Sequence, residues 1–243
     1  MTTIVSAFIS NVNSRIDRNI DNYYTLGKLL LKSSTPKIIF LDENMYNLIQ
    51  DNDYNKENTL IIKYDKNESY LYNYINSLHN FKLNTDNPSK DTIEYMFTMC
   101  NKTEWLRKAI DNDIFKSENF IWLDFGIKQV YSCSDNDFIQ KINKLRHKKY
   151  DKVRIGHIWD LSLQYNIDVL RQISWYFAGG VFGGNKNSLL KFADLMKEKC
   201  IEIMNIADTI MWEVNIWYIL YKENPELFEP YPCDHSNSII DNY

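Results

Sequence analysis

The sequence has few of the residues that interrupt regular structure, with 7 glycines and 5 prolines in 243 residues. This scarcity excludes collagen-like and low-complexity descriptions of the whole chain. Its 4 cysteines form no CxxC pair, so zinc-ribbon and thioredoxin motifs are excluded, and we interpret them as reduced thiols. No apolar run reaches the roughly 18–20 residues that span a bilayer, and the N-terminal stretch lacks the pattern of a signal peptide. We therefore expect a cytoplasmic protein without a transmembrane segment.

Positive charge is also in short supply. The 28 Lys and Arg residues are outnumbered by 32 Asp and Glu, which gives a formal net charge of −4. This balance argues against a dedicated nucleic-acid binder. Cations are locally in excess in the segment KINKLRHKKYDKVR at 141–154. We interpret this segment as a solvated helix face, and the alternative is that it binds an anionic ligand.

What the chain does have is a 44% hydrophobic content in short β-rich runs that alternate with helical periodicity. This alternation predicts an α/β fold. Strands are expected at 3–10, 37–41, 59–64, 119–123, 152–158 and 173–182, and helices at 23–32, 69–79, 88–110, 188–204 and 208–223. Three of the five prolines fall in 225–232, which predicts an irregular tail. Because no linker divides the chain, we expect one domain over 1–243, with a nucleotide-binding half (1–126) and an acceptor-binding, closing half (127–243).

The segment FIWLDFGI at 120–127 predicts a hydrophobic strand with one carboxylate, Asp124, at its C-terminal end. In open α/β sheets, ligands bind outside the carboxyl ends of the strands. An Asp at this place can hold a divalent cation that bridges two phosphates, because hard cations prefer oxygen ligands. The alternative is an Asp that ends a strand and caps a turn.

The segment AGGVFGG at 178–184 contains four of the seven glycines. Where glycine is this rare, a cluster indicates a backbone requirement, either positive φ or close approach to a ligand. The pattern is neither a P-loop nor a dinucleotide-binding GxGxxG. It predicts a side-chain-free floor under a bound sugar or phosphate, and the alternative is a bulged turn between a strand and a helix.

Two acidic residues, Asp208 and Glu213, lie on the helix expected near 207–220, flanked by tryptophans. A carboxylate beside aromatic walls can orient hydroxyl groups or act as a base, whereas on an ordinary amphipathic helix both acids face solvent. His235 lies near the C-terminus. If the tail folds back over Asp124, a neutral imidazole there completes a cation site; otherwise His235 is a surface residue.

Taken in order, TIVSAF, NKTEWLRKAI, FIWLDFG, WYFAGGVFGG and the acidic helix with its tryptophans resemble the HtrL/YibB-like family. That family is itself similar to glycosyltransferases of the GT-A fold. The resemblance extends from about Thr2 to Ile240, and FIWLDFG and WYFAGGVFGG are its most specific parts. It implies a GT-A-like, Rossmann-like mixed sheet flanked by helices.

The resemblance also implies roles for the residues at the donor. Ala7 and Phe8 would meet the nucleotide base and ribose, and Lys102 would lie near the phosphates or the donor sugar. Gly179 and Gly180 would lie under the donor sugar.

Further roles implied by the resemblance concern acids and a metal. Asp124 would take the first position of a DxD motif and His235 would be a late metal ligand, with Mn²⁺ or Mg²⁺ as the cofactor. Glu213 would contact donor or acceptor. The second Asp of the motif is Gly126 here, so one carboxylate is missing and a second metal ligand has to come from elsewhere.

The resulting hypothesis is a glycosyltransferase that moves a sugar from a nucleotide-sugar donor, a UDP-sugar, to a hydroxyl group of a glycan or protein acceptor. Glu213 would orient the reactants or act as the base, and Asp208 is the second candidate for this role. The alternative hypothesis is a catalytically inactive protein of the same fold that binds a nucleotide or glycan without turnover, which the missing second Asp favours.

Overall fold

The structure is a computed structural model that describes residues 1–13, 15 and 19–243. Its strands are β1 (Thr2–Phe8), β2 (Lys37–Leu41), β3 (Thr59–Lys63), β4 (Asn119–Leu123), β5 (Val153–His157), β6 (Phe177–Asn185) and β7 (Phe228–Pro232). Its α-helices are α1 (Ile20–Leu31), α2 (Glu43–Leu48), α3 (Tyr70–Ile75), α4 (Ile93–Cys100), α5 (Lys102–Asp111), α6 (Asp135–Leu145), α7 (Lys186–Ala207), α8 (Glu213–Glu223) and α9 (Ser238–Asp241). Short 3₁₀ helices are η2 (Lys66–Glu68), η3 (Ile127–Val130) and η4 (Pro225–Leu227).

The seven strands form one sheet in the order β3-β2-β1-β4-β6-β5-β7. Strands β3, β2, β1 and β4 run parallel, β6 is antiparallel to its neighbours β4 and β5, and β7 is parallel to β5. The predicted α/β class with a mixed sheet flanked by helices is confirmed. Both halves of the chain contribute to the sheet, because β4 from the first half pairs with β6 from the second.

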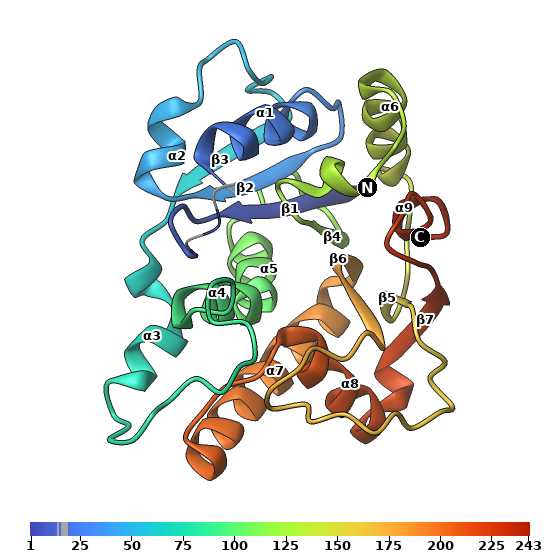
Figure 1. Cartoon of the computed structure of the whole chain (residues 1–243). Coiled ribbons are helices and arrows are strands. Elements are labelled where there is room, and N and C mark those ends of the chain that lie inside the picture. Colours follow the sequence, from blue (N-terminus) through green and yellow to red (C-terminus); the bar gives the residue numbers. More distant parts are fainter. Residues whose placement is uncertain (14, 16–18) are drawn as a thin grey trace.

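Helices cover both faces of the sheet, as Figure 1 shows. Alternate residues of β4 point to opposite faces: Phe120 and Trp122 join the apolar cluster under α4, α5, α7 and α8, and Ile121 and Leu123 join the cluster under α1, α2 and α6. This alternation is the two-residue period of a strand, and burial on both faces explains why the strands read as continuous apolar runs. None of the helices in the described part of the chain combines the length and apolarity needed to cross a membrane.

Several element boundaries differ from those predicted. The helix expected over 88–110 is two helices, because Asn101 interrupts it and its side-chain oxygen accepts a hydrogen bond from Ser69 Oγ at 3.0 Å. The helix expected from Asp208 begins at Glu213. The tail expected to be irregular contains β7, an edge strand. Its two prolines fit there because an edge strand can lack ladder donors.

The strand expected at 173–182 begins only at Phe177 and continues through all four glycines to Asn185. None of the described glycines has positive φ, so close packing is the requirement. A Cβ at Gly183 would lie 2.4 Å from the Phe120 backbone oxygen, and one at Gly184 would lie 2.5 Å from the Lys152 backbone oxygen. These two glycines let β6 approach its neighbouring strands, and the segment is not a turn.

Candidate active site

The carboxyl ends of β1 and β4 border a pocket of about 270 Å³. The chain leaves β1 for β2 and β3 on one side, whereas β4 lies on the other side of β1, so the strand order reverses here. Such a switch point is the usual ligand site of an open α/β sheet. Ala7 and Phe8 reach the pocket from the end of β1, and Asp124 reaches it directly after β4.

The Asp124 carboxylate is fixed by two donors. Trp122 Nε1 donates to Asp124 Oδ1 at 2.7 Å, and Lys102 Nζ lies 3.0 Å from the same oxygen. Its backbone N–H donates to the Gly180 oxygen at 3.0 Å, which ties the strand end to β6. The side chain is 37% exposed. With both fixed donors on Oδ1, Asp124 presents Oδ2 as its oxygen for a ligand.

Lys102 joins Asp124 to the second predicted acid. Its buried ammonium donates to Glu213 Oε1 at 3.0 Å and to the Gly179 backbone oxygen at 2.9 Å, so its three bonds reach three different segments of the chain. Burial disfavours the charged form, but the charges of Asp124 and Glu213 outweigh it and raise the pKa of Lys102 above its ordinary value. Two carboxylates around one ammonium leave the cluster with a net negative charge.

Gly179 and Gly180 lie against this cluster. A Cβ at Gly179 would lie 2.6 Å from Glu213 Oε1, and a Cβ at Gly180 would lie 2.6 Å from Ile127 Cδ1 and 3.8 Å from Asp124 Oδ2. The structure thus brings five of the predicted site residues together: Lys102, Asp124, Gly179, Gly180 and Glu213. The glycines leave room for the cluster, and no glycine-rich turn is present.

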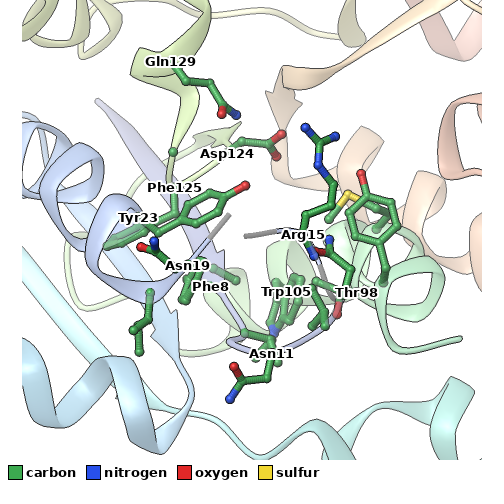
Figure 2. Close-up of a pocket in the computed structure, with 18 of the residues that line it drawn as sticks. Phe8, Asn11, Arg15, Asn19, Tyr23, Thr98, Trp105, Asp124, Phe125 and Gln129 are labelled. Atoms are coloured by element: carbon green, nitrogen blue, oxygen red, sulfur yellow. The ribbon is translucent and has the colours of Figure 1, made fainter. Parts of the chain in front are cut away.

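Aromatic and amide side chains line the rest of the pocket. The rings of Phe8 and Tyr23 lie 4.7 Å apart, and Figure 2 shows the Tyr23 ring and the Asp124 carboxylate facing the same space. The guanidinium of Arg15 points toward that space as well. The side-chain amides come from the loop after β1 and from η3: Asn11, Asn13, Asn19 and Gln129. An apolar wall with a few polar groups is typical of a small-molecule site.

Gly126, at the place of the missing second Asp, also has a packing role. A Cβ there would lie 2.5 Å from Tyr23 Cε1, so the ring that lines the pocket fills the space of a side chain. The Tyr23 ring in the pocket wall therefore occupies the space that an aspartate side chain at position 126 would need.

Two predicted site residues, Asp208 and His235, lie outside both the cluster and the pocket. Asp208 is exposed at the end of α7 in a left-handed conformation (φ 48°), and its backbone oxygen accepts from Lys82 N at 2.8 Å. The His235 ring packs perpendicular to Trp175 with ring centres 4.2 Å apart. A catalytic role for Asp208 and a metal-ligand role for His235 stay predictions.

The protein alone supplies few ligands for a divalent cation. Across residues 1–13, 15 and 19–243, no three or more His, Cys, Asp or Glu side chains form a group able to hold a metal. Asp124 offers one oxygen, because Oδ1 is engaged by Lys102 and Trp122. Mg²⁺ is commonly held by one or two carboxylates together with substrate phosphates. The residues therefore fit a cation that binds together with a diphosphate.

Sequence reasoning missed part of the pocket. Tyr23 lines the pocket, although no pattern in the sequence marks it as a site residue. Trp122 was read only as a strand residue, although its position two before Asp124 puts both side chains on one face of the strand, within reach of each other. Arg15 and Gln129 follow the ends of β1 and β4, and only their place after a predicted strand could have indicated them.

The fold and the pocket define the class of protein. It is an α/β protein with an acidic residue at the switch point of its sheet. A family model described as "Bacterial protein of unknown function (HtrL_YibB)" matches residues 1–235, and the chain belongs to this family. The resemblance found in the sequence is thereby confirmed. A sequence search of curated proteins finds no match.

Solved structures that align with most of this chain include three with transferase or synthase names. One is a glycosyltransferase involved in the glycosylation of the major capsid of PBCV-1 (12% identity, TM-score 0.44, covering 95% of this chain and 81% of that chain). Another is mouse xyloside xylosyltransferase 1 in its apo form (9% identity, TM-score 0.42, 96% and 86%). The third is 4-diphosphocytidyl-2C-methyl-D-erythritol synthase from Anaerococcus prevotii (11% identity, TM-score 0.41, 96% and 86%).

Proposed function

We propose that this protein is a cytoplasmic glycosyltransferase that takes a sugar from a UDP-sugar and transfers it to a hydroxyl group of a glycan or protein. The observation that carries the proposal is the position of Asp124. Its carboxylate borders a pocket at the switch point of the sheet, and a buried lysine joins it to Glu213. Nucleotide-binding α/β sheets use this place for their ligands.

The lining of the pocket supports a nucleotide as the donor's leaving group. A base can stack on the Phe8 and Tyr23 rings, while the side-chain amides of Asn11 and Asn19 can donate to and accept from its edge. Ala7 is small enough to let the ribose approach the end of β1. The Arg15 guanidinium faces the pocket and suits phosphate oxygens.

The reaction would proceed by attack of an acceptor hydroxyl oxygen on C1 of the donor sugar. The bond between C1 and the phosphate oxygen breaks, its electron pair leaves with UDP, and the proton of the hydroxyl group passes to the departing phosphate oxygen. A divalent cation, bound by Asp124 Oδ2 and the diphosphate, would supply charge stabilisation for this leaving group. Gly179 and Gly180 would serve this site through the cluster, because Glu213 Oε1 and Ile127 Cδ1 take up the space that a side chain there would fill.

Lys102 and Glu213 would act as positioning residues in this proposal. Lys102 is only 2% exposed and donates to oxygens of three protein segments, so it holds Asp124 and is too buried to reach the substrate. Glu213 is 6% exposed and holds Lys102 in turn. We leave Asp208 out of the proposed site, because its contacts lie at the end of α7.

The test is calorimetric titration with UDP, GDP and UDP-sugars, with Mn²⁺ or with a chelator, followed by measurement of donor hydrolysis. Asp124→Asn keeps the shape and an oxygen for Lys102 but removes the charge. We expect it to weaken UDP binding in Mn²⁺ by at least about tenfold, or 1.4 kcal/mol, and to stop hydrolysis. Asp51→Asn, at an 83% exposed side chain, is the matched control. Unchanged affinity and rate in Asp124→Asn would contradict the proposal.

A second candidate function is nucleotide or glycan binding without turnover. The observation that favours it is Gly126, which leaves Asp124 without the usual partner carboxylate and whose space is filled by Tyr23. Saturable UDP-sugar binding without release of UDP over prolonged incubation would support this candidate over the enzyme.

A further inference from the structure

The loop directly after β1, residues 9–12 and here termed the β1 loop, forms one wall of the pocket. Three of its residues, Ile9, Asn11 and Val12, border the pocket and also border a second hollow of about 660 Å³. Asn11 is exposed. Because the loop borders two hollows, packing gives Asn11 little support, and its position depends on the hydrogen bonds of its neighbours.

The first of these neighbours, Ser10, is tied to the end of β2. Asp42 directly follows β2, and its Oδ2 accepts from Ser10 N at 2.8 Å and also from Ser10 Oγ. The Asp42 backbone N–H donates to the Phe8 oxygen at 3.1 Å, and Asn44 Nδ2 donates to Ser10 Oγ at 3.0 Å. A carboxylate makes stronger hydrogen bonds than a neutral acceptor does. Asp42 is therefore the main anchor on this side of Asn11.

The other neighbour, Val12, is tied to the start of α4. Thr92 Oγ1 donates to the Val12 backbone oxygen and accepts from Tyr95 N at 3.1 Å, which makes Thr92 the N-cap of α4. Asp42 is likewise the N-cap of α2, because its Oδ1 accepts from Met45 N at 3.0 Å. The β1 loop is thus held between the N-caps of two helices.

Asn11 lies between these two anchors in a left-handed conformation, with φ 58°. Asn adopts this conformation more readily than most residues, and a residue persists in it where its surroundings fix it. Figure 2 shows Asn11 and Asp124 at opposite ends of the pocket. The anchors therefore act at the end of the pocket that lies away from the acidic cluster.

We propose that Asp42 is a positioning residue for the nucleoside end of the pocket, because its Oδ2 holds Ser10 and thereby fixes Asn11 beside the base. This inference rests on the proposed function, which assigns the base to Asn11 and its neighbours. Both carboxylate oxygens of Asp42 are engaged by the protein, one by the helix cap and one by the β1 loop. Asp42 therefore acts through the loop and not by contact with the ligand.

Two substitutions separate the loop anchor from the helix cap. Asp42→Ser keeps one oxygen to cap α2, since Ser and Asp are similarly good N-caps, but has no second oxygen for Ser10. Asp42→Ala removes both. In calorimetric titrations with Mn²⁺ we expect both variants to bind UDP about tenfold more weakly, whereas binding of pyrophosphate, which depends on Asp124, should change less than about twofold.

The matched control is Ser134→Ala, which removes the N-cap of α6, where Ser134 Oγ accepts from Asp137 N at 3.1 Å. It should leave both affinities unchanged. Two results would overturn the inference. One is that Asp42→Ser binds UDP as tightly as the unaltered protein, which would assign the loss in Asp42→Ala to the helix cap. The other is an equal loss of UDP and pyrophosphate affinity.

A double variant tests the route through Asn11. Asn11→Ala alone should weaken UDP binding about tenfold, and adding it to Asp42→Ser should cause little further loss, because the same contact is already lost. A combined loss of about a hundredfold would mean that the two residues act independently, which contradicts the inference.

Amide hydrogen exchange distinguishes failure of this inference from failure of the proposed function. We expect Asp42→Ser to exchange the Ser10 amide at least about tenfold faster than the unaltered protein, since that N–H loses its acceptor. Equal exchange in the two proteins overturns the anchoring role, with or without UDP binding. Faster exchange in a protein that does not bind UDP means that the donor proposal fails while the anchoring role of Asp42 stands.

Discussion

At the scale of single residues, Lys102 determines the arrangement of the candidate site. Its ammonium is the only group that contacts both Asp124 and Glu213 among the ion pairs of the described residues. The cluster is buried except at Asp124, so the lysine compensates charges that solvent cannot reach. Removing one partner of such a buried group leaves an uncompensated charge, which is the costly way to break it.

We expect Lys102→Met to destabilise the protein by about 3–5 kcal/mol, because Glu213 is left buried and charged without its partner. Urea denaturation measures this loss. The double variant Lys102→Met with Glu213→Gln should recover part of the stability, since it removes the stranded charge. A double variant no more stable than Lys102→Met would show that the cost has another origin.

Gly126 gives a second prediction at this scale. Gly126→Asp introduces the second aspartate of a DxD motif, but its Cβ would lie 2.5 Å from Tyr23 Cε1 and displace that ring. We expect weaker UDP binding by about tenfold, or 1.4 kcal/mol, and no gain in Mn²⁺ affinity in the absence of nucleotide. Calorimetry with UDP and with Mn²⁺ alone measures both quantities. Tighter Mn²⁺ binding by the variant would show that the place is open to a ligand.

At the scale of elements, two strands carry residues that conflict with ordinary strand composition. Strand β6 contains four glycines. Its neighbouring strands approach closely at Gly183 and Gly184. The cluster of Lys102, Asp124 and Glu213 approaches at Gly179 and Gly180. Strand β2 begins with the buried Lys37, whose ammonium donates to the Ser33 backbone oxygen at 2.7 Å. In both strands the tertiary environment overrides local propensity.

Lys37 makes the stability of the protein depend on pH. Burial lowers the pKa of Lys37 from 10.5 to about 7 in the folded protein. The unfolded chain therefore binds more protons between these values, and the unfolding free energy contributed by this group rises with pH from about 7 to 10.5. That contribution is lost as the pH falls through 7.

We expect Lys37→Met to flatten this dependence. Between pH 7 and 9.5 the unfolding free energy of the unaltered protein should rise more steeply, by up to about 1.4 kcal/mol per pH unit. Urea denaturation of both proteins at several pH values gives the two slopes. Parallel slopes would mean that the ammonium stays charged in the folded protein and is held by its hydrogen bonds.

At the scale of the whole molecule, the sheet is shared by both halves of the chain, and the acidic cluster takes residues from each. The basic segment 141–154 also serves this assembly. Lys141 pairs with Asp241, Arg154 pairs with Glu229 at 2.8 Å, and Lys148 Nζ donates to the Tyr243 backbone oxygen at 2.6 Å. These cations hold the C-terminal segment against the sheet, so they form less of an open basic surface than the sequence suggests.

We therefore expect no measurable binding of a fluorescein-labelled DNA or RNA duplex at physiological salt, since the net charge is −4 and part of the basic segment is paired. Fluorescence anisotropy measures this. Binding that weakens steeply with salt would instead assign the segment to a polyanion.

The sequence by itself determined the alternation of strands and helices and the buried strand that ends at Asp124, because these depend on local periodicity and on residues close in the chain. The broken helix at Asn101 and the start of β6 at Phe177 depended on contacts with Ser69 and Asn215, which are distant in sequence.

Only the tertiary structure decided which candidates meet. It brought Lys102, Asp124 and Glu213 together and put Asp208 at the exposed end of another helix, although Asp208 and Glu213 are five residues apart in the sequence. The physical reason is that the charges of this cluster come from α5, from the residue directly after β4 and from α8, whose mutual placement is fixed by packing on the sheet and not by any local pattern of residues.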